Sequence, residues 1–186
     1  MTKDFCRLKL VEELTSLVIN CPWGVMSQMK MHLYESLKAI FLHIDNHEKT
    51  YLYDHGLNIP RFYILLHVSH NPGINYIDLS DLLLCTKSNT TRVVQGMVKD
   101  ELIIRENDPN DRRSYKLFLT DKGTNLLARV YPGFINQIES LLSCFNDQEA
   151  SQYLEVSQHI ESSLSPDSTL NLTNSQVLAS MMRSGG

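Results

Sequence analysis

Two adjacent arginines stand in a polar loop between two hydrophobic stretches. The loop belongs to "RENDPNDRRSYKLFLTDKG", residues 105–123, which follows the apolar "LII" and contains the alternating "YKLFLT". These stretches are typical of two strands, and the Asn, Asp and Pro between them favour a turn. Arg112 and Arg113 would then lie at a hairpin tip, where guanidinium groups suit the negative potential of a narrow minor groove. Asp111 can orient one of them by a charge-assisted hydrogen bond. The alternative is an ordinary charged turn.

A second polar cluster lies where a helix is expected to begin. In "LLLCTKSNTTRVVQGMVKDE", Thr86 can cap a helix that follows an earlier one after a tight turn. Helical spacing directs Val93, Val94 and Met97 inward. Arginine can donate two hydrogen bonds to guanine, asparagine pairs with adenine, and hydroxyl groups reach bases or phosphates. The candidate DNA contacts are therefore Lys87, Ser88, Asn89, Thr91 and Arg92. A solvated helix face is the alternative.

Helical periodicity dominates the rest of the chain, with Asn58 as a further N-cap and Pro60 in the first turn of its helix. A bend is expected at "PG", residues 132–133. The predicted fold is mainly α-helical with a small β-hairpin. The expected helices span about residues 5–19, 25–53, 58–71, 75–84, 87–100, 121–145 and 147–164, and the expected strands are "LIIRE" and "YKLFLT".

Composition and charge limit the available functions. The 186 residues carry a net charge of −4, but residues 85–122 hold eight basic and six acidic side chains, which suggests a positive face on an acidic body. No apolar run reaches the roughly 18 residues needed to cross a bilayer, and acidic residues near the start argue against a signal peptide. A cytoplasmic protein is expected. Its four cysteines are far apart in the sequence, which favours reduced thiols over structural zinc.

The loop and the helix pair together resemble the winged helix-turn-helix regulators of the multiple antibiotic resistance (MarR) family. "DPNDRRSYKLFLTDKG" is similar to the family's wing signature, and "NPGINYIDLSDLLLCTKSNTTRVVQGMVKDELIIRE" to the reading head before it. The resemblance covers about residues 25–164. It implies that Asp111 is the wing acid, Arg113 the minor-groove arginine and 87–100 the recognition helix. Glu101 departs from the pattern, because a Gly often closes that helix.

Assembly and domain organisation follow from the long apolar faces after the wing. These faces exceed what a small winged domain can cover, and the resemblance implies an obligate homodimer joined through terminal helices. A two-fold dimer would bind double-stranded DNA at a pseudo-palindromic operator. The expected parts are N-terminal dimerisation helices (1–57), a winged helix-turn-helix domain (58–120), C-terminal dimerisation helices (121–164) and a tail that could form a short helix (165–186). We expect a dimeric repressor released by a small ligand. The alternative is a winged-helix protein-interaction module without operator specificity.

The input that would control such a regulator has several candidates. The resemblance implies a small aromatic or phenolic effector between the dimer helices and the reading head, where the chain offers Trp23, Phe41, Tyr63 and His67. Aromatic residues at these positions could instead be simple core residues. Cys21 makes a thiol-based redox sensor the second candidate, although no basic residue within seven positions would lower its pKa.

The remaining chemistry-bearing residues support neither a metal site nor an enzyme. His43 and His47 share a helix face and could join Asp54 or His55, but a third ligand is lacking, and we predict no metal and no cofactor. Cys85 is interpreted as a small buried hydrophobe. The chain has no phosphate-cradling glycine loop and no G-x-S-x-G elbow, and its H-x-x-x-H lacks the glutamate of a zinc protease, so it is not expected to be an enzyme.

Overall fold

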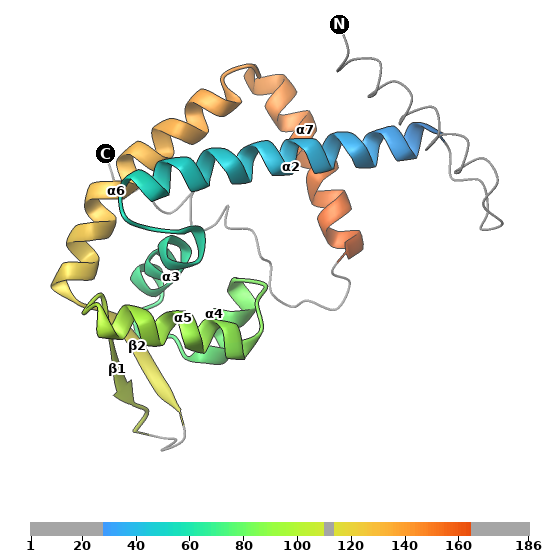
Figure 1. Ribbon diagram of the computed structural model, residues 1–186. Coiled ribbons are helices and arrows are strands. Elements are labelled where there is room, and N and C mark those ends of the chain that lie inside the picture. The colour runs from blue at the N-terminus through green and yellow to red at the C-terminus, as the bar shows by residue number, and fades with distance from the viewer. Residues whose placement is uncertain (1–27, 110–113, 165–186) are drawn as a thin grey trace, which may run out of the picture. The chain divides into compact units, whose positions relative to one another are not determined.

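The computed structural model describes residues 28–109 and 114–164. They form a mainly helical fold with a two-stranded antiparallel hairpin, which confirms the predicted fold class (Figure 1). The chain divides into two units at 46/47, inside the first described helix. The predicted helix at 5–19 lies outside the described residues. The elements are α2 (Gln28–Asp54), α3 (Ile59–His70), α4 (Tyr76–Leu82), α5 (Lys87–Lys99), β1 (Ile103–Asn107), β2 (Tyr115–Leu119), α6 (Asp121–Leu142) and α7 (Asp147–Leu164).

Side-chain caps determine where the helices of the reading head begin. This name is used for residues 59–119, from α3 to β2. The Asn58 side chain accepts a hydrogen bond from the Arg61 amide, and Pro60 occupies the first turn, as predicted. The Thr86 hydroxyl accepts one from the Asn89 amide at the start of α5. Each cap satisfies an amide that has no partner within its helix, which stabilises that end by about 1 kcal/mol.

The core of the second unit surrounds α3, which contacts α4, α5, α6 and β2. Phe62 of α3 packs on Phe134 of α6 with ring centroids 4.4 Å apart. Leu52, at the end of α2, joins the same cluster. The largest fully buried apolar side chains of this core are Phe62, Leu52, Ile64, Leu65, Leu79, Met97, Ile103 and Leu117. The reading head and the first part of α6 therefore share one hydrophobic core.

The hairpin is joined to this core at its base. Ile103 pairs with Leu119 at the base of the ladder, and Asn107 pairs with Tyr115 at its far end. Ile74, before α4, forms a bridge with Leu117, so a third stretch of backbone covers the edge of β2. The far half of the hairpin consequently projects away from the head (Figure 1).

Helix α6 is buried over its first part and exposed over its last. The buried residues are Gly123, Leu127, Val130 and Phe134. The helix continues through Pro132, although proline cannot donate the usual backbone hydrogen bond, and its ribbon changes direction partway along (Figure 1). The Tyr51 hydroxyl donates to the Val130 carbonyl at 2.8 Å, one turn before the exposed part begins.

Candidate nucleic-acid interface

The candidate base-reading residues lie on the N-terminal half of α5. Ser88 and Arg92 are exposed, as is Lys87, whereas Asn89 is half-buried. The Arg92 guanidinium donates to the Asn89 side-chain oxygen at 3.0 Å, so the two side chains are already ordered as a pair. The Thr91 hydroxyl donates to the Lys87 carbonyl at 2.7 Å, which leaves its methyl group and oxygen lone pair available.

The inward face of α5 differs slightly from the predicted one. Thr90, Val94 and Met97 are fully buried, whereas Val93 is only partly buried against the core. The buried set follows the spacing of three and four residues that places side chains on one helix face. Thr90 was missed because its hydroxyl makes it look like a surface residue in the sequence.

The turn that connects α4 to α5 corrects the prediction for Cys85. The Cys85 amide donates to the Ser80 carbonyl at 3.0 Å, and Leu84 before it has a left-handed backbone with φ +50°. The Cys85 side chain is exposed rather than buried. Proximity to an apolar run in the sequence does not predict burial here, because a tight turn carries its side chains outward between the two helices.

The C-terminal end of α5 closes with a Schellman motif. The Leu102 amide donates to the Met97 carbonyl at 2.9 Å, and the Glu101 amide to the Val98 carbonyl at 3.1 Å. Glu101 has φ +60°, the left-handed backbone that glycine usually provides. Glu101 therefore stands where a glycine is often found, but the Schellman motif that closes α5 is still formed.

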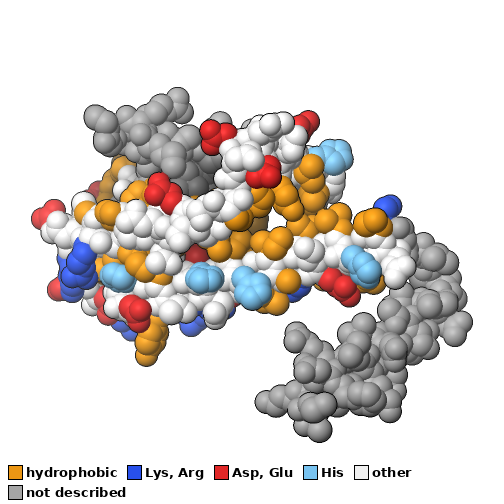
Figure 2. All heavy atoms as spheres, turned by 90° about the horizontal axis from the view of Figure 1, so that it is seen from above, with side chains coloured by type: hydrophobic (Ala, Val, Ile, Leu, Met, Phe, Trp, Pro, Cys, Tyr) orange, Lys and Arg blue, Asp and Glu red, His pale blue; other side chains and the backbone are white. Residues whose placement is uncertain are grey.

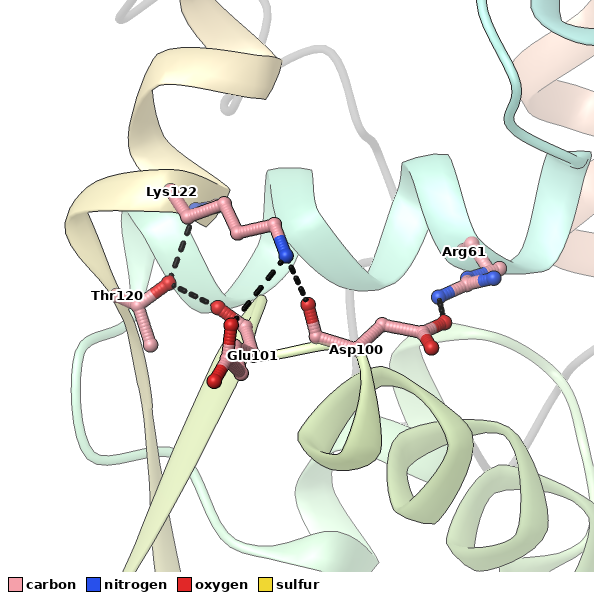
Figure 3. A network of polar contacts seen from close by, with 6 residues as sticks. Arg61, Asp100, Glu101, Thr120 and Lys122 are labelled. Atoms are coloured by element: carbon pink, nitrogen blue, oxygen red, sulfur yellow. Dashed lines mark hydrogen bonds and ion pairs between the residues drawn. The ribbon is translucent and has the colours of Figure 1, made fainter.

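A polar network ties the end of α5 to the base of the hairpin and to α6 (Figure 3). The Thr120 hydroxyl donates to the Glu101 carbonyl at 2.6 Å and accepts from the Gly123 amide at 3.0 Å. The Lys122 ammonium donates to the Asp100 carbonyl at 2.8 Å, and Asp100 also pairs with Arg61 of α3. Because these contacts converge on one joint, the hairpin has a defined direction relative to α5.

The hairpin carries a cation that the sequence interpretation missed. The Arg105 guanidinium lies 5.1 Å from the centroid of the Tyr115 ring, and its side chain is exposed. Its β1 position faces Leu117 in the ladder, on the side of the hairpin that packs on the head. The sequence did contain a signal for Arg105. It stands two positions after Ile103 in a predicted strand, so both side chains lie on the same face of that strand. Asp111, Arg112 and Arg113 lie outside the described residues.

Two of the four predicted effector-pocket residues lie together in α3. Tyr63 and His67 have ring centroids 6.4 Å apart, and the Tyr63 hydroxyl donates to the Glu48 carboxylate at 3.1 Å. Burial and the Glu48 carboxylate both raise the pKa of Tyr63. Phe41 is exposed on the part of α2 that belongs to the first unit. Trp23 lies outside the described residues, as does Cys21.

His67 is fully buried, and its Nδ1 has no hydrogen-bond partner within the described part of the chain. Burial lowers the pKa of His67, and the nearby His70 lowers it further. The imidazole is therefore expected to be neutral at pH 7.

The described ranges hold neither a set of metal ligands nor a membrane-spanning helix. Across 28–109 and 114–164 no three His, Cys, Asp or Glu side chains are grouped closely enough to hold a metal ion, so His43 and His47 have no third ligand there. None of the helices in these ranges is long and apolar enough to cross a membrane.

Two helices joined by a tight turn, followed by a hairpin anchored to the second of them, define a winged helix-turn-helix protein. Comparison with known proteins narrows this class. Residues 57–115 match the model of the MarR family. This match confirms the resemblance to the MarR family seen in the sequence, and transcriptional regulators and a solved MarR structure are likewise similar to the chain.

Individual relatives agree with this assignment. The chain is 26% identical to the HTH-type transcriptional regulator MhqR of Bacillus subtilis over 135 residues, which cover 73% of this chain and 93% of MhqR. It is 29% identical to the transcriptional repressor MprA of Escherichia coli over 142 residues, 75% of this chain and 77% of MprA. A mutant of Escherichia coli MarR, solved in complex with operator DNA, shares the fold with a TM-score of 0.67 at 16% identity, covering 74% of this chain and 99% of that one.

Proposed function

We propose that this chain is a sequence-specific, double-stranded DNA-binding repressor that acts as a homodimer and is released by a small ligand. The observation that carries the proposal is the hydrogen-bonded pair of exposed Arg92 and half-buried Asn89 on α5, beside a hairpin that is anchored to the same helix. Such a pair offers donors and acceptors to base edges in the major groove. The printed name of the relative MprA supports the repressor role.

Exposed apolar side chains support the homodimer. In the first unit, Leu33, Leu37 and Phe41 of α2 are exposed. No residue of α7 is buried, and its exposed apolar side chains include Tyr153 and Leu154. Figure 2 shows hydrophobic side chains open to solvent on one face of the described helices. Exposed apolar patches usually mark an interaction surface, and we assign the one on α2 and the one on α7 each to contacts with a second copy of the chain.

The two-fold symmetry of a homodimer dictates the form of the operator. Two recognition helices would enter successive major grooves about 34 Å apart, so half-sites should be centred about ten base pairs apart. Arg112 and Arg113, which stand between β1 and β2 in the sequence, would reach the flanking minor grooves, with Asp111 orienting one of them. Lys87, Ser88 and Thr91 would contact phosphates or bases beside the pair formed by Asn89 and Arg92.

A small aromatic or phenolic ligand is the proposed release signal. Tyr63 and His67 supply an aromatic wall with a buried ring nitrogen that has no hydrogen-bond partner among the described residues, and Trp23 and Phe41 are the further residues proposed for the pocket. The ligand must bind one spacing of the reading heads more tightly than the other, since equal affinity would shift nothing. Oxidation of Cys21 is the alternative signal.

The first experiment is selection of bound sequences from a random duplex pool at two salt concentrations. Counterion release makes phosphate contacts strongly salt-dependent, so the two conditions separate them from base recognition. Enrichment of a two-fold site with half-sites about ten base pairs apart is expected. Weak binding that ignores sequence and disappears with salt would contradict the proposal and favour a protein-interaction module.

Variants then test the two parts of the interface on the selected operator. Arg92→Gln and Arg113→Ala should each weaken binding by about 1–3 kcal/mol, with relaxed base preference at the position read by Arg92. Lys30→Gln, an exposed change on α2, is the matched control and should leave the affinity unchanged. Sedimentation of the free protein at micromolar concentration should give the mass of two chains, and a monomer would remove the dimer from the proposal.

A further inference from the structure

A basic groove lies on the reading head beside the joint of α5, the hairpin and α6. It consists of two adjoining hollows of about 480 and 600 Å³, which share Leu102, Lys122 and Leu126 in their walls. The first also contains Arg61 and Lys99, and the second contains Asn125 and Arg129. All of these residues belong to the second unit of the chain.

The cations of the basic groove come from three separate elements. Arg61 lies in the first turn of α3, Lys99 is the last residue of α5, and Lys122 and Arg129 lie on the first two turns and a half of α6. They are up to 68 positions apart in the sequence, from 61 to 129. The fold alone brings them together, so no linear motif indicates the groove.

Charge at the basic groove is poorly balanced. Its walls carry four cations and one carboxylate, Asp100, whereas the chain as a whole has a net charge of −4. Arg61 is paired with Asp100, and Lys122 lies 3.5 Å from the Glu101 carboxylate. Lys99 and Arg129 form no ion pair with any residue in the described ranges. Two cations thus remain available to a ligand.

The position of Lys122 strengthens the positive potential. It lies in the first turn of α6, where the helix dipole is positive and acidic side chains are favoured. Its ammonium already donates to the Asp100 carbonyl at 2.8 Å and lies 3.5 Å from the Glu101 carboxylate, so these contacts hold it at the groove, where a bound anion would add a further partner. The groove also has apolar walls, because Leu57 and Leu102 are buried beneath it and Leu126 is half-buried.

We propose that the basic groove binds a small organic anion with at least two negative charges, held between Lys99 and Arg129 and next to Lys122. Charge-assisted hydrogen bonds from these side chains would bind its phosphate or carboxylate groups. The leucine walls would cover an apolar part of the ligand. The groove is separate from Tyr63 and His67, the residues proposed above for an aromatic effector.

Binding at this place has a consequence for regulation, which rests on the proposed function. The anion would connect the end of the recognition helix to the start of α6, across the joint formed by Thr120 and Glu101 (Figure 3). A ligand that contacts both elements favours the arrangement in which they are closest. If the DNA-bound and the released arrangements of the reading heads differ at this joint, the anion would therefore change the affinity for the operator.

The test measures anion binding to the full chain without DNA. Pyrophosphate and citrate are titrated separately by calorimetry at a constant ionic strength of about 0.15 M, so that screening of the charges does not change during the experiment. We expect saturable binding of one anion per chain with a dissociation constant of about 1 mM or lower for at least one probe. A preference for pyrophosphate or for citrate distinguishes a phosphate ligand from a carboxylate ligand.

Matched variants locate the site. The double variant Lys99→Gln with Arg129→Gln should weaken binding about tenfold or more, because it removes both unpaired cations. Lys30→Gln removes an exposed cation outside the groove and should have no effect. Should the double variant fail to fold, as judged by its thermal unfolding, Arg129→Gln alone is compared with Lys30→Gln, and at least a threefold weakening is required.

Two results would overturn the inference. The first is that neither probe shows saturable binding. The second is that both probes bind the double variant with the same affinity as the original chain. A loss of operator affinity in the variant, with no anion binding to the free protein, would make the basic groove a DNA-phosphate surface and also reject the small-anion site. Since the titration contains no DNA, its failure leaves the proposed DNA-binding function standing.

Discussion

Gly123 allows α6 to start directly against the backbone at Leu102, just after the end of α5. A Cβ atom at this position would overlap the Leu102 carbonyl oxygen and would lie 3.1 Å from the Leu102 carbonyl carbon. That carbonyl is held in place, because it accepts a hydrogen bond from the Thr120 amide at 3.2 Å. Gly123 has no positive φ, so its role here is close approach rather than backbone conformation.

Helix propensity and packing predict opposite signs for Gly123→Ala. Alanine is favoured over glycine inside a helix by about 1 kcal/mol. Forcing a methyl group into backbone that cannot move away costs about 1–3 kcal/mol, and the joint with Thr120 would have to open by a substantial fraction of an ångström. The difference of the two effects predicts that the free energy of unfolding falls by up to about 2 kcal/mol. Urea unfolding followed by circular dichroism measures it, with the slope against urea unchanged.

Gly96 of α5 is the matched control for this substitution. It is also a helical glycine, but a Cβ atom there would have no heavy atom within 4 Å. Gly96→Ala should consequently raise the free energy of unfolding by about 0.5–1 kcal/mol. If Gly123→Ala stabilises the protein as much as Gly96→Ala does, α6 does not approach Leu102 as described and the packing argument is wrong.

Two further predictions concern backbone strain and a buried histidine. Glu101→Gly should raise the free energy of unfolding by about 0.5 kcal/mol in the same urea assay, because relief of the left-handed backbone exceeds the loss of an exposed contact with Lys122. Glu101→Gln, which keeps the strain, should change it by less than about 0.5 kcal/mol, and equal effects would refute the strain argument. The pKa of His67 is lowered in the folded protein, so the unfolded chain binds more protons below its ordinary value of 6.5, and stability should fall as pH decreases from about 7 to 5. His67→Leu should reduce this dependence in urea midpoints measured across that range, and an unchanged dependence would assign it to other groups.

Local signals explain why the helices were predicted well. Asn58 and Thr86 lie immediately before apolar periodic stretches, and each one caps its helix in the structure. A cap acts within three residues of its own position, so the sequence contains the whole interaction. Asn75 caps α4 in the same way, through the Ile77 and Asp78 amides, and the prediction placed that helix within two residues of its observed end.

Signals that depend on tertiary contact were missed or misread. Cys85 looked buried because leucines precede it, yet the left-handed turn at Leu84 exposes both side chains. Arg105 was overlooked because only the strand register places it beside Tyr115. The basic groove could not be found at all, since its cations come from three elements that are distant in the sequence.

The division of α6 into a buried and an exposed part bears on how the heads could be controlled. Leu127, Val130 and Phe134 hold its first part in the core of the reading head, and the Tyr51 hydroxyl adds a hydrogen bond to Val130. The exposed last part is available to a partner chain under the proposed dimer. Because the helix is continuous, a displacement of the dimer contacts must either move the head with it or change the bend near Pro132. A ligand or contact that stiffens the joint of α5, the hairpin and α6 favours movement of the head together with the dimer contacts. The basic groove lies at this joint.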